Sequence, residues 1–159
     1  MNKKSNLLML LILSLLLLSV PFSSASDKNP VELRKSDKCP VCGMFVEKYR
    51  NWLAEVIFTD GTYAVFDGPK DMFRYYRDVK KHNPSKNASD ISNMYVTEYY
   101  STKIMDARKV FFVYGSDVYG PMGAELVPLA NETAAKEFLK DHKGSRILKF
   151  SEVTGEHLK

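Results

Sequence analysis

The sequence predicts an α+β fold in which two similar ββα units form one compact domain. An Asp-Gly dipeptide between two short β-favouring runs indicates a tight hairpin, and an amphipathic helix follows the second run directly. The same order of glycine-bearing segment, β structure and amphipathic helix returns in the second half of the chain. We therefore place the halves at about 39–81 and 94–150, within one domain at 39–159.

The N-terminus has the features of a secretory signal peptide. Lys3 and Lys4 precede an apolar run from Leu7 to Leu18, and small residues lead to a cleavage position near Ala25. A retained membrane anchor is the alternative, but the apolar run is shorter than the roughly 20 residues that span a bilayer. The sequence thus predicts a signal peptide at 1–25 and a periplasmic protein.

The mature chain is long enough for one domain and is nearly neutral. Removing 25 residues from 159 leaves 134, which begin with an extended polar lead-in at 26–38. Without the two N-terminal lysines, 21 basic residues face 19 acidic ones, so no electrostatic footprint for nucleic acid is present. A lipoprotein would carry a cysteine at the cleavage point, whereas the first cysteine is Cys39, so no lipid anchor is predicted.

The first half contains the clearest hairpin of the chain. Runs at 52–58 and 62–66 favour β structure and flank Asp60-Gly61, a dipeptide that supplies positive φ in a tight turn. Pro69 suits the first turn of the following helix, which is expected to end near Lys81. The buried face of this helix is expected to hold Met72, Phe73, Tyr76 and Val79.

The second half follows a polar loop at 80–90. Asn131 is a suitable N-cap for an amphipathic helix that Gly144 ends. Four runs favour β-strands, with glycines at several of the turns: 95–100, 110–114, 125–128 and a closing strand at 147–150.

The segment Cys39-Pro40-Val41-Cys42-Gly43-Met44 brings two thiols and a thioether into six residues. Soft sulfur donors favour copper(I) over hard cations such as magnesium or calcium. Gly43 lacks a Cβ, so the backbone can turn sharply enough to direct the Cys42 and Met44 sulfurs at one centre. A neutral thioether binds zinc poorly, so Met44 favours copper(I) within the soft class.

Other uses of the two cysteines need partners that the sequence does not place nearby. Zinc needs about two further Cys or His ligands, whereas His82, His142 and His157 lie far apart. Covalent haem needs a histidine directly after the second cysteine, where a glycine stands. A thioredoxin-type pair would follow a buried strand, and here a polar lead-in precedes it. A structural disulfide between Cys39 and Cys42 stays open for an exported chain.

At this segment the chain resembles the NosL family, accessory proteins of nitrous oxide reductase that bind copper(I). The resemblance covers nearly all of the mature chain and implies a fold related to that of organomercurial lyase. It rests on landmarks in a fixed order: Cys39 to Met44, Trp52-Leu53-Ala54, Phe66-Asp67-Gly68, Asp106-Ala107 with Tyr114, and Gly120-Pro121-Met122-Gly123.

The resemblance implies a set of ligands and a function. The copper-binding thiol and thioether fall on Cys42 and Met44, while Met122 lies in the turn that matches the family's other methionine element, and Cys39 is a further candidate. The implied function is that of a metallochaperone, not an enzyme, which delivers copper(I) to the copper centres of nitrous oxide reductase. Its expected partners are that reductase and its periplasmic or membrane assembly machinery. Many relatives are lipoproteins.

We predict Met122 as a third sulfur ligand because a Gly-Pro-Met-Gly turn is expected to expose the methionine. The alternative is that Met122 plugs the end of the core, since methionine fills gaps readily.

A second functional class would use the same thiols in catalysis. Cys39 and Cys42 would serve a thiol-disulfide oxidoreductase or a lyase of the organomercurial type. The lyase needs an acidic proton donor beside paired thiols. Asp67 and Asp106 are candidates by composition, although each is more often a cap or turn residue.

Overall fold

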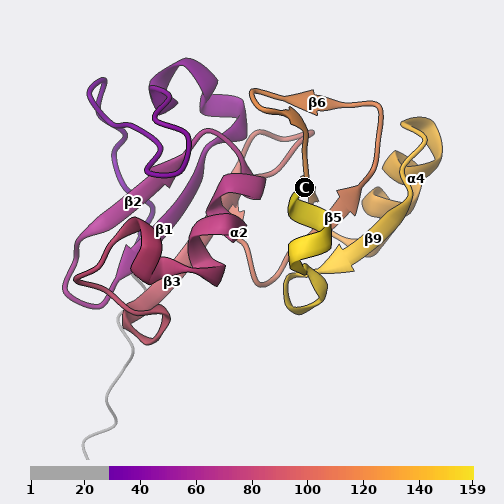
Figure 1. Ribbon diagram of the computed structural model, residues 1–159. Coiled ribbons are helices and arrows are strands. Elements are labelled where there is room, and N and C mark those ends of the chain that lie inside the picture. The colour runs from indigo at the N-terminus through magenta and orange to yellow at the C-terminus, as the bar shows by residue number, and fades with distance from the viewer. Residues whose placement is uncertain (1–28) are drawn as a thin grey trace, which may run out of the picture.

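The computed structural model describes residues 29–159, and the predicted signal peptide lies outside them. In this part of the chain no helix has both the length and the apolar character needed to cross a membrane. Two antiparallel sheets lie side by side, with α2 (Pro69–Arg77) against the first and the C-terminal segment between them (Figure 1).

The first sheet has four strands in the order β2-β1-β3-β4, and every pair is antiparallel. Its strands are β1 (Ala54–Phe58), β2 (Tyr63–Phe66), β3 (Ile91–Thr97) and β4 (Ile104–Asp106). The predicted hairpin is confirmed: Gly61 has φ of +88°, and Phe58 N–H donates to the Thr62 carbonyl at 2.9 Å. The 3₁₀ helix η2 (Val46–Trp52) precedes β1, and a second, η3 (Ala88–Asp90), leads into β3.

The predicted helix from Pro69 to about Lys81 is divided in two. α2 ends at Arg77, and α3 (Val79–His82) follows after Asp78, whose backbone leaves the helical conformation. The Asp78 side chain accepts the Lys81 N–H at 3.3 Å, so the acid caps α3 where a continuous helix was expected. The predicted apolar face is otherwise confirmed, because Met72, Phe73 and Val79 are buried and Tyr76 is half-buried.

The second sheet has the order β8-β5-β9, again antiparallel throughout. Its strands are β5 (Phe111–Tyr114), β8 (Val127–Leu129) and β9 (Arg146–Lys149), and a short hairpin of β6 (Tyr119–Gly120) and β7 (Gly123–Ala124) lies between β5 and β8. α4 (Glu132–Asp141) begins as predicted at Asn131, whose side chain accepts the Ala134 N–H at 2.9 Å. Two 3₁₀ turns, η4 (Phe150–Glu152) and η5 (Gly155–Leu158), end the chain.

The two units repeat one plan. Along the chain the first unit contains β1, β2, α2 and β3, and its strands lie in the sheet order β2-β1-β3. The second unit contains β5, β8, α4 and β9 in the same way, and its strands lie in the order β8-β5-β9. The predicted α+β class with two similar units is therefore confirmed. A strand follows the helix in each unit, and the one in the second unit, β9, corresponds to the closing strand predicted at 147–150.

One strand lies in a different unit from the one expected. The run at 95–100 was predicted to open the second half, but β3 pairs with β1, with Ala54 opposite Val96. The reason is hydrogen bonding: β1 is buried along its whole length and has two edges, and β2 satisfies only one of them. Strand periodicity alone does not reveal which edge a strand will join.

Packed aromatic rings join the units at α2. Phe73 of α2 meets Phe112 of β5 edge to face at a centroid distance of 5.1 Å, and it also contacts Phe150. A smaller cluster around Phe138 fills the outer part of the second unit. Because α2 is packed against residues of both units, the start of this helix is held in a fixed position.

Glu55 is a fully buried carboxyl group in the centre of the first sheet. Its Oε2 accepts the Val31 N–H at 3.0 Å, whereas Oε1 has no hydrogen-bond partner within residues 29–159. Burial raises the pKa of Glu55 to about 7. The folded protein therefore favours the protonated form, and stability that is fully present below pH 4.5 is lost as the pH rises through about 7.

We expect Glu55→Gln to reduce this loss, because an amide keeps the acceptor for Val31 and carries no charge to bury. Wild type should lose stability between pH 4.5 and 8, and the variant should lose about 2–3 kcal/mol less. Urea unfolding of the reduced, metal-free protein at several pH values measures the difference. Equal pH slopes for the two proteins would show that Glu55 is not the group responsible.

Candidate metal site

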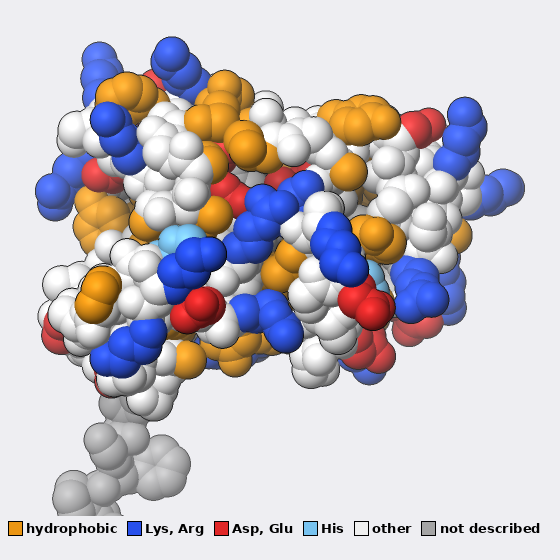
Figure 2. Space-filling model, viewed as in Figure 1, with side chains coloured by type: hydrophobic (Ala, Val, Ile, Leu, Met, Phe, Trp, Pro, Cys, Tyr) orange, Lys and Arg blue, Asp and Glu red, His pale blue; other side chains and the backbone are white. Residues whose placement is uncertain are grey.

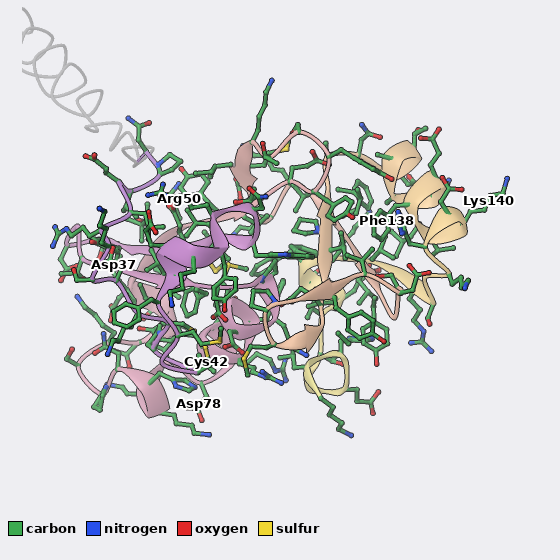
Figure 3. The ribbon with its side chains drawn as sticks, turned by 90° about the horizontal axis from the view of Figure 1, so that it is seen from above. Asp37, Cys42, Arg50, Asp78, Phe138 and Lys140 are labelled. Atoms are coloured by element: carbon green, nitrogen blue, oxygen red, sulfur yellow. The ribbon has the colours of Figure 1, made fainter. Side chains whose placement is uncertain are left out.

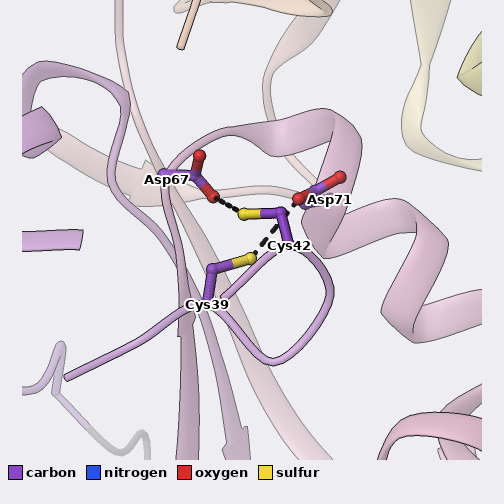
Figure 4. Close-up of side chains that lie close together, drawn as sticks. All are labelled: Cys39, Cys42, Asp67 and Asp71. Carbon is purple, nitrogen blue, oxygen red and sulfur yellow. Dashed lines mark hydrogen bonds between the residues drawn. The ribbon is translucent and has the colours of Figure 1, made fainter. Parts of the chain in front are cut away.

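The loop from Cys39 to Met44 is closed by its own backbone. Cys39 N–H donates to the Met44 carbonyl at 2.9 Å, and Gly43 N–H donates to the Cys39 carbonyl at 2.8 Å. Gly43 has φ of +81°, a conformation that residues with side chains rarely adopt. The sharp turn predicted at Gly43 is confirmed, and both thiols point towards the end of β2 and the start of α2 (Figure 4).

Two carboxylates face these thiols. Asp67 follows β2 directly, and Asp71 lies in the first turn of α2. The Cys42 thiol donates to Asp67 Oδ1 at 3.1 Å, and the Cys39 thiol donates to Asp71 Oδ2 at 3.4 Å (Figure 4). One ligand atom from each of the four side chains lies within 4.8 Å of all the others. We call Cys39, Cys42, Asp67 and Asp71 the thiol-carboxylate cluster.

The cluster is open on one side. Cys39, Asp67 and Asp71 are at most 2% exposed, whereas Cys42 is half-buried. An ion that enters or leaves the cluster therefore meets the Cys42 sulfur first.

The environment keeps both thiols protonated at neutral pH. Burial raises the pKa of Cys42 to about 11. The Met44 N–H lowers this pKa, whereas the nearby Asp67 carboxylate raises it. Burial raises the pKa of Cys39 still further, although backbone N–H groups of Cys42 and Val41 oppose it. A metal ion that binds these sulfurs must displace protons, so its apparent affinity will increase with pH.

The carboxylates differ in how they are held. Arg74 donates to Asp71 Oδ1 at 2.7 Å and also to the Leu158 carbonyl, so Asp71 is fixed by an ion pair. Asp67 Oδ2 is buried and has no hydrogen-bond partner in the described part of the chain. A buried acceptor without a partner is costly, and beside two thiols it is suited to face a cation. The sulfur donors decide which cation, and they favour a soft ion.

The structure places the four residues predicted as ligands on two loops. Cys39 and Cys42 meet in the cluster, Met44 is half-buried on the same loop, and Met122 is exposed in the β6-β7 hairpin. The ligand roles of these four residues therefore stay predictions. Asp71 was missed, and the only available signal was its position four residues after Asp67, at the start of a helix.

The two aspartates considered as proton donors have different surroundings. Asp67 contacts a thiol, as above. Asp106 lies at the end of β4, accepts the Arg108 N–H at 2.9 Å and pairs with Lys109, so it is a turn residue.

The β6-β7 hairpin that contains Met122 is anchored next to the cluster. Glu125 follows this hairpin, and its carboxylate accepts the Lys70 N–H in the first turn of α2 at 2.7 Å. A Cβ at Gly68 or Gly120 would lie within 3.1 Å of Glu125 side-chain atoms, so the carboxylate is enclosed between these two glycines. Met122 is 46% exposed in the turn of the hairpin.

Known proteins of one family match this chain. The NosL family profile matches residues 30–158. The copper-binding lipoprotein NosL of Stutzerimonas stutzeri is 30% identical over 144 residues. This match covers 79% of the present chain and 66% of the relative, so the chain spans slightly less than two thirds of the relative's length.

A solved structure of the family shows the same fold. The copper chaperone NosL from Shewanella denitrificans superposes with a TM-score of 0.69 at 20% identity, over 81% of this chain and 98% of that one. The solution structure of apo-NosL from Achromobacter cycloclastes gives a TM-score of 0.47 at 23% identity, over 66% and 87%. Because the family profile extends over almost all of the described residues, this chain belongs to the NosL family.

Proposed function

We propose that this protein is an exported copper(I) carrier that holds the ion through Cys42 and Met44 and passes it to a partner protein. The observation that carries the proposal is the half-buried Cys42 thiol at the open side of an otherwise buried cluster. A soft ligand at the opening can hold the ion while a second protein's ligand approaches. The names of the relatives, a copper-binding lipoprotein and a copper chaperone, support copper as the ion.

The oxidation state, the client and the location follow from the same proposal. Thiolate and thioether ligands favour copper(I), and Cys39 would be a further ligand or the partner of Cys42 in an oxidised form. The client is nitrous oxide reductase, reached through its periplasmic or membrane assembly machinery, in line with the family resemblance. The predicted signal peptide and the lipoprotein relative support export. The protein carries the ion and catalyses no reaction on it.

Titration of the reduced mature protein with copper(I), in competition with a chromophoric chelator, tests the proposal. We expect one tightly bound ion for each chain. A thiol-disulfide exchange assay on the same sample should show little activity, because thiols with raised pKa values form few thiolates at neutral pH. Rapid exchange together with weak copper binding would instead identify an oxidoreductase.

We expect Met122→Leu to remove one sulfur from the copper(I) shell and to lower the affinity about tenfold, roughly 1.4 kcal/mol. Met122 is exposed on a hairpin that Glu125 anchors beside the cluster, and leucine preserves the approximate volume without the thioether. Copper X-ray absorption gives the sulfur count, and competition with a chelator gives the affinity.

Met94→Leu is the matched control, since Met94 is fully buried in β3 and should leave both values unchanged. If Met122→Leu behaves like this control, Met122 is a packing residue.

A second candidate function is protonolysis of a carbon-mercury bond, because the Cys42 thiol lies 3.1 Å from Asp67 Oδ1. In such a lyase the thiols take the mercury ion, and an acid delivers a proton to the carbon that leaves. The raised pKa values of both thiols disfavour this use, since the attack needs a thiolate. Release of benzene from a phenylmercury salt by the reduced protein, abolished in Asp67→Asn, would establish it.

A further inference from the structure

A basic groove of about 470 Å³ lies beside the cysteine loop, at the surface formed by α2, α3 and the C-terminal segment. Figure 2 shows Lys and Arg side chains gathered over α2 on this face. The groove is lined by Val41, Arg74, Arg77, Asp78, Lys81, His82 and Leu158.

Two cations of the groove are free to bind a ligand. Within residues 29–159 the exposed side chains of Arg77 and Lys81 form no ion pair and no hydrogen bond. Arg74 adds a third positive charge, but it is already paired with Asp71. Asp78 is an acid in the lining, and its carboxylate accepts the Lys81 N–H as a helix cap. Positive charge therefore exceeds negative charge along the groove.

The groove also has an apolar part that touches the metal loop. Val41, which lies between the two cysteines, and Leu158 provide the apolar side chains of the lining. On the same side, Arg74 links the groove to the cluster, because its partner Asp71 accepts the Cys39 thiol at 3.4 Å. A chain bound in the groove would lie next to the loop that carries both thiols.

We propose that this basic groove binds an acidic segment of the protein that receives the copper ion, an inference that rests on the proposed function. Carboxylates of the segment pair with Arg77 and Lys81, and an apolar side chain packs against Val41 and Leu158. Such complementarity steers the encounter and fixes the orientation of the partner. It would place the partner's own sulfur ligands beside Cys42, the opening of the cluster.

Two synthetic peptides with the same pair of methionines test the proposal, one flanked by glutamates and the other by glutamines. Binding to the reduced, metal-free mature protein is measured at low salt by fluorescence anisotropy. We expect the glutamate peptide to bind about tenfold more tightly and to lose most of this advantage near 0.5 M salt, where surface charges are screened. Arg77→Glu with Lys81→Glu should lower its affinity at least about tenfold.

The matched control is Lys103→Glu with Lys140→Glu, which changes the net charge equally at exposed positions outside the groove. Figure 3 shows Cys42 and Asp78 on the same side of the molecule and Lys140 at the opposite end. The control should keep the affinity for the glutamate peptide within about twofold, and copper transfer to that peptide should slow only in the groove variant.

Equal affinities for the two peptides, or an equal loss in the control variant, would overturn the groove as a docking site. Preference for the glutamate peptide in a protein that fails to bind copper(I) would support the groove and refute the proposed function.

Discussion

Replacement of Cys42 by serine is expected to lower the copper(I) affinity by about a thousandfold, on the order of 4 kcal/mol. Cys42 is the thiol next to Gly43-Met44 and the only half-buried member of the cluster. As a thiolate it would supply the negative charge and the soft donor that a serine hydroxyl lacks. Cys39→Ser is expected to cost about tenfold, because Cys39 lies behind Cys42 and is a secondary ligand.

Both variants are measured under reducing conditions, in competition with a chromophoric chelator at several pH values. Because burial raises the pKa of Cys42 to about 11, wild-type affinity should increase about tenfold per pH unit for each proton released. In the Cys42→Ser variant at least one proton fewer is released on binding, so the affinity should increase less steeply with pH than in wild type. If Cys42→Ser keeps the affinity and Cys39→Ser loses it, the two roles are reversed.

Local signals made most of the secondary structure predictable. Asp60-Gly61 determined the hairpin, and Asn131 marked the start of α4, since the energetics of a turn or a cap depend on nearby residues. The helix break at Asp78 was not predicted, because an acid in a polar stretch is compatible with a continuous exposed helix. The partner of β3 was not predicted either, since pairing depends on which sheet edge is free in three dimensions.

The site was predictable only where its chemistry was concentrated in sequence. The segment from Cys39 to Met44 combines rare soft donors, so residue type alone indicated a metal site. Asp71 resembles any acid in the first turn of a helix, and only the packing of the loop against α2 makes it a neighbour of Cys39. Glu125 comes from the second unit, and nothing in its local sequence indicates that it caps a helix of the first.

This contact between units leads to the second large expected effect: Gly68→Ala should destabilise the protein by about 3 kcal/mol. Gly68 has extended φ and ψ angles that any residue adopts, so the requirement is for space. An added Cβ would lie 2.2 Å from Glu125 Oε2. Glu125 is 4% exposed and accepts backbone N–H groups from Lys70 and Leu126, so it cannot move without leaving them unpaired.

A double-mutant cycle with Glu125→Ala separates steric conflict from a general effect on the helix. Removal of the carboxylate leaves the Lys70 N–H without its acceptor, but it creates room for the new methyl group. The double variant should therefore be more stable, by at least about 1 kcal/mol, than the sum of the two single effects predicts. Gly155→Ala is the control and should be neutral within about 0.5 kcal/mol, since its Cβ would approach only Arg77 Nε, at 4.0 Å. Urea unfolding of the reduced, metal-free proteins provides all the values.

Additive effects at positions 68 and 125 would mean that Glu125 does not restrict this position. Coupling would show that a carboxylate from the second unit fixes the start of α2, and with it Asp67 and Asp71 of the cluster, because Gly68 lies directly between β2 and α2.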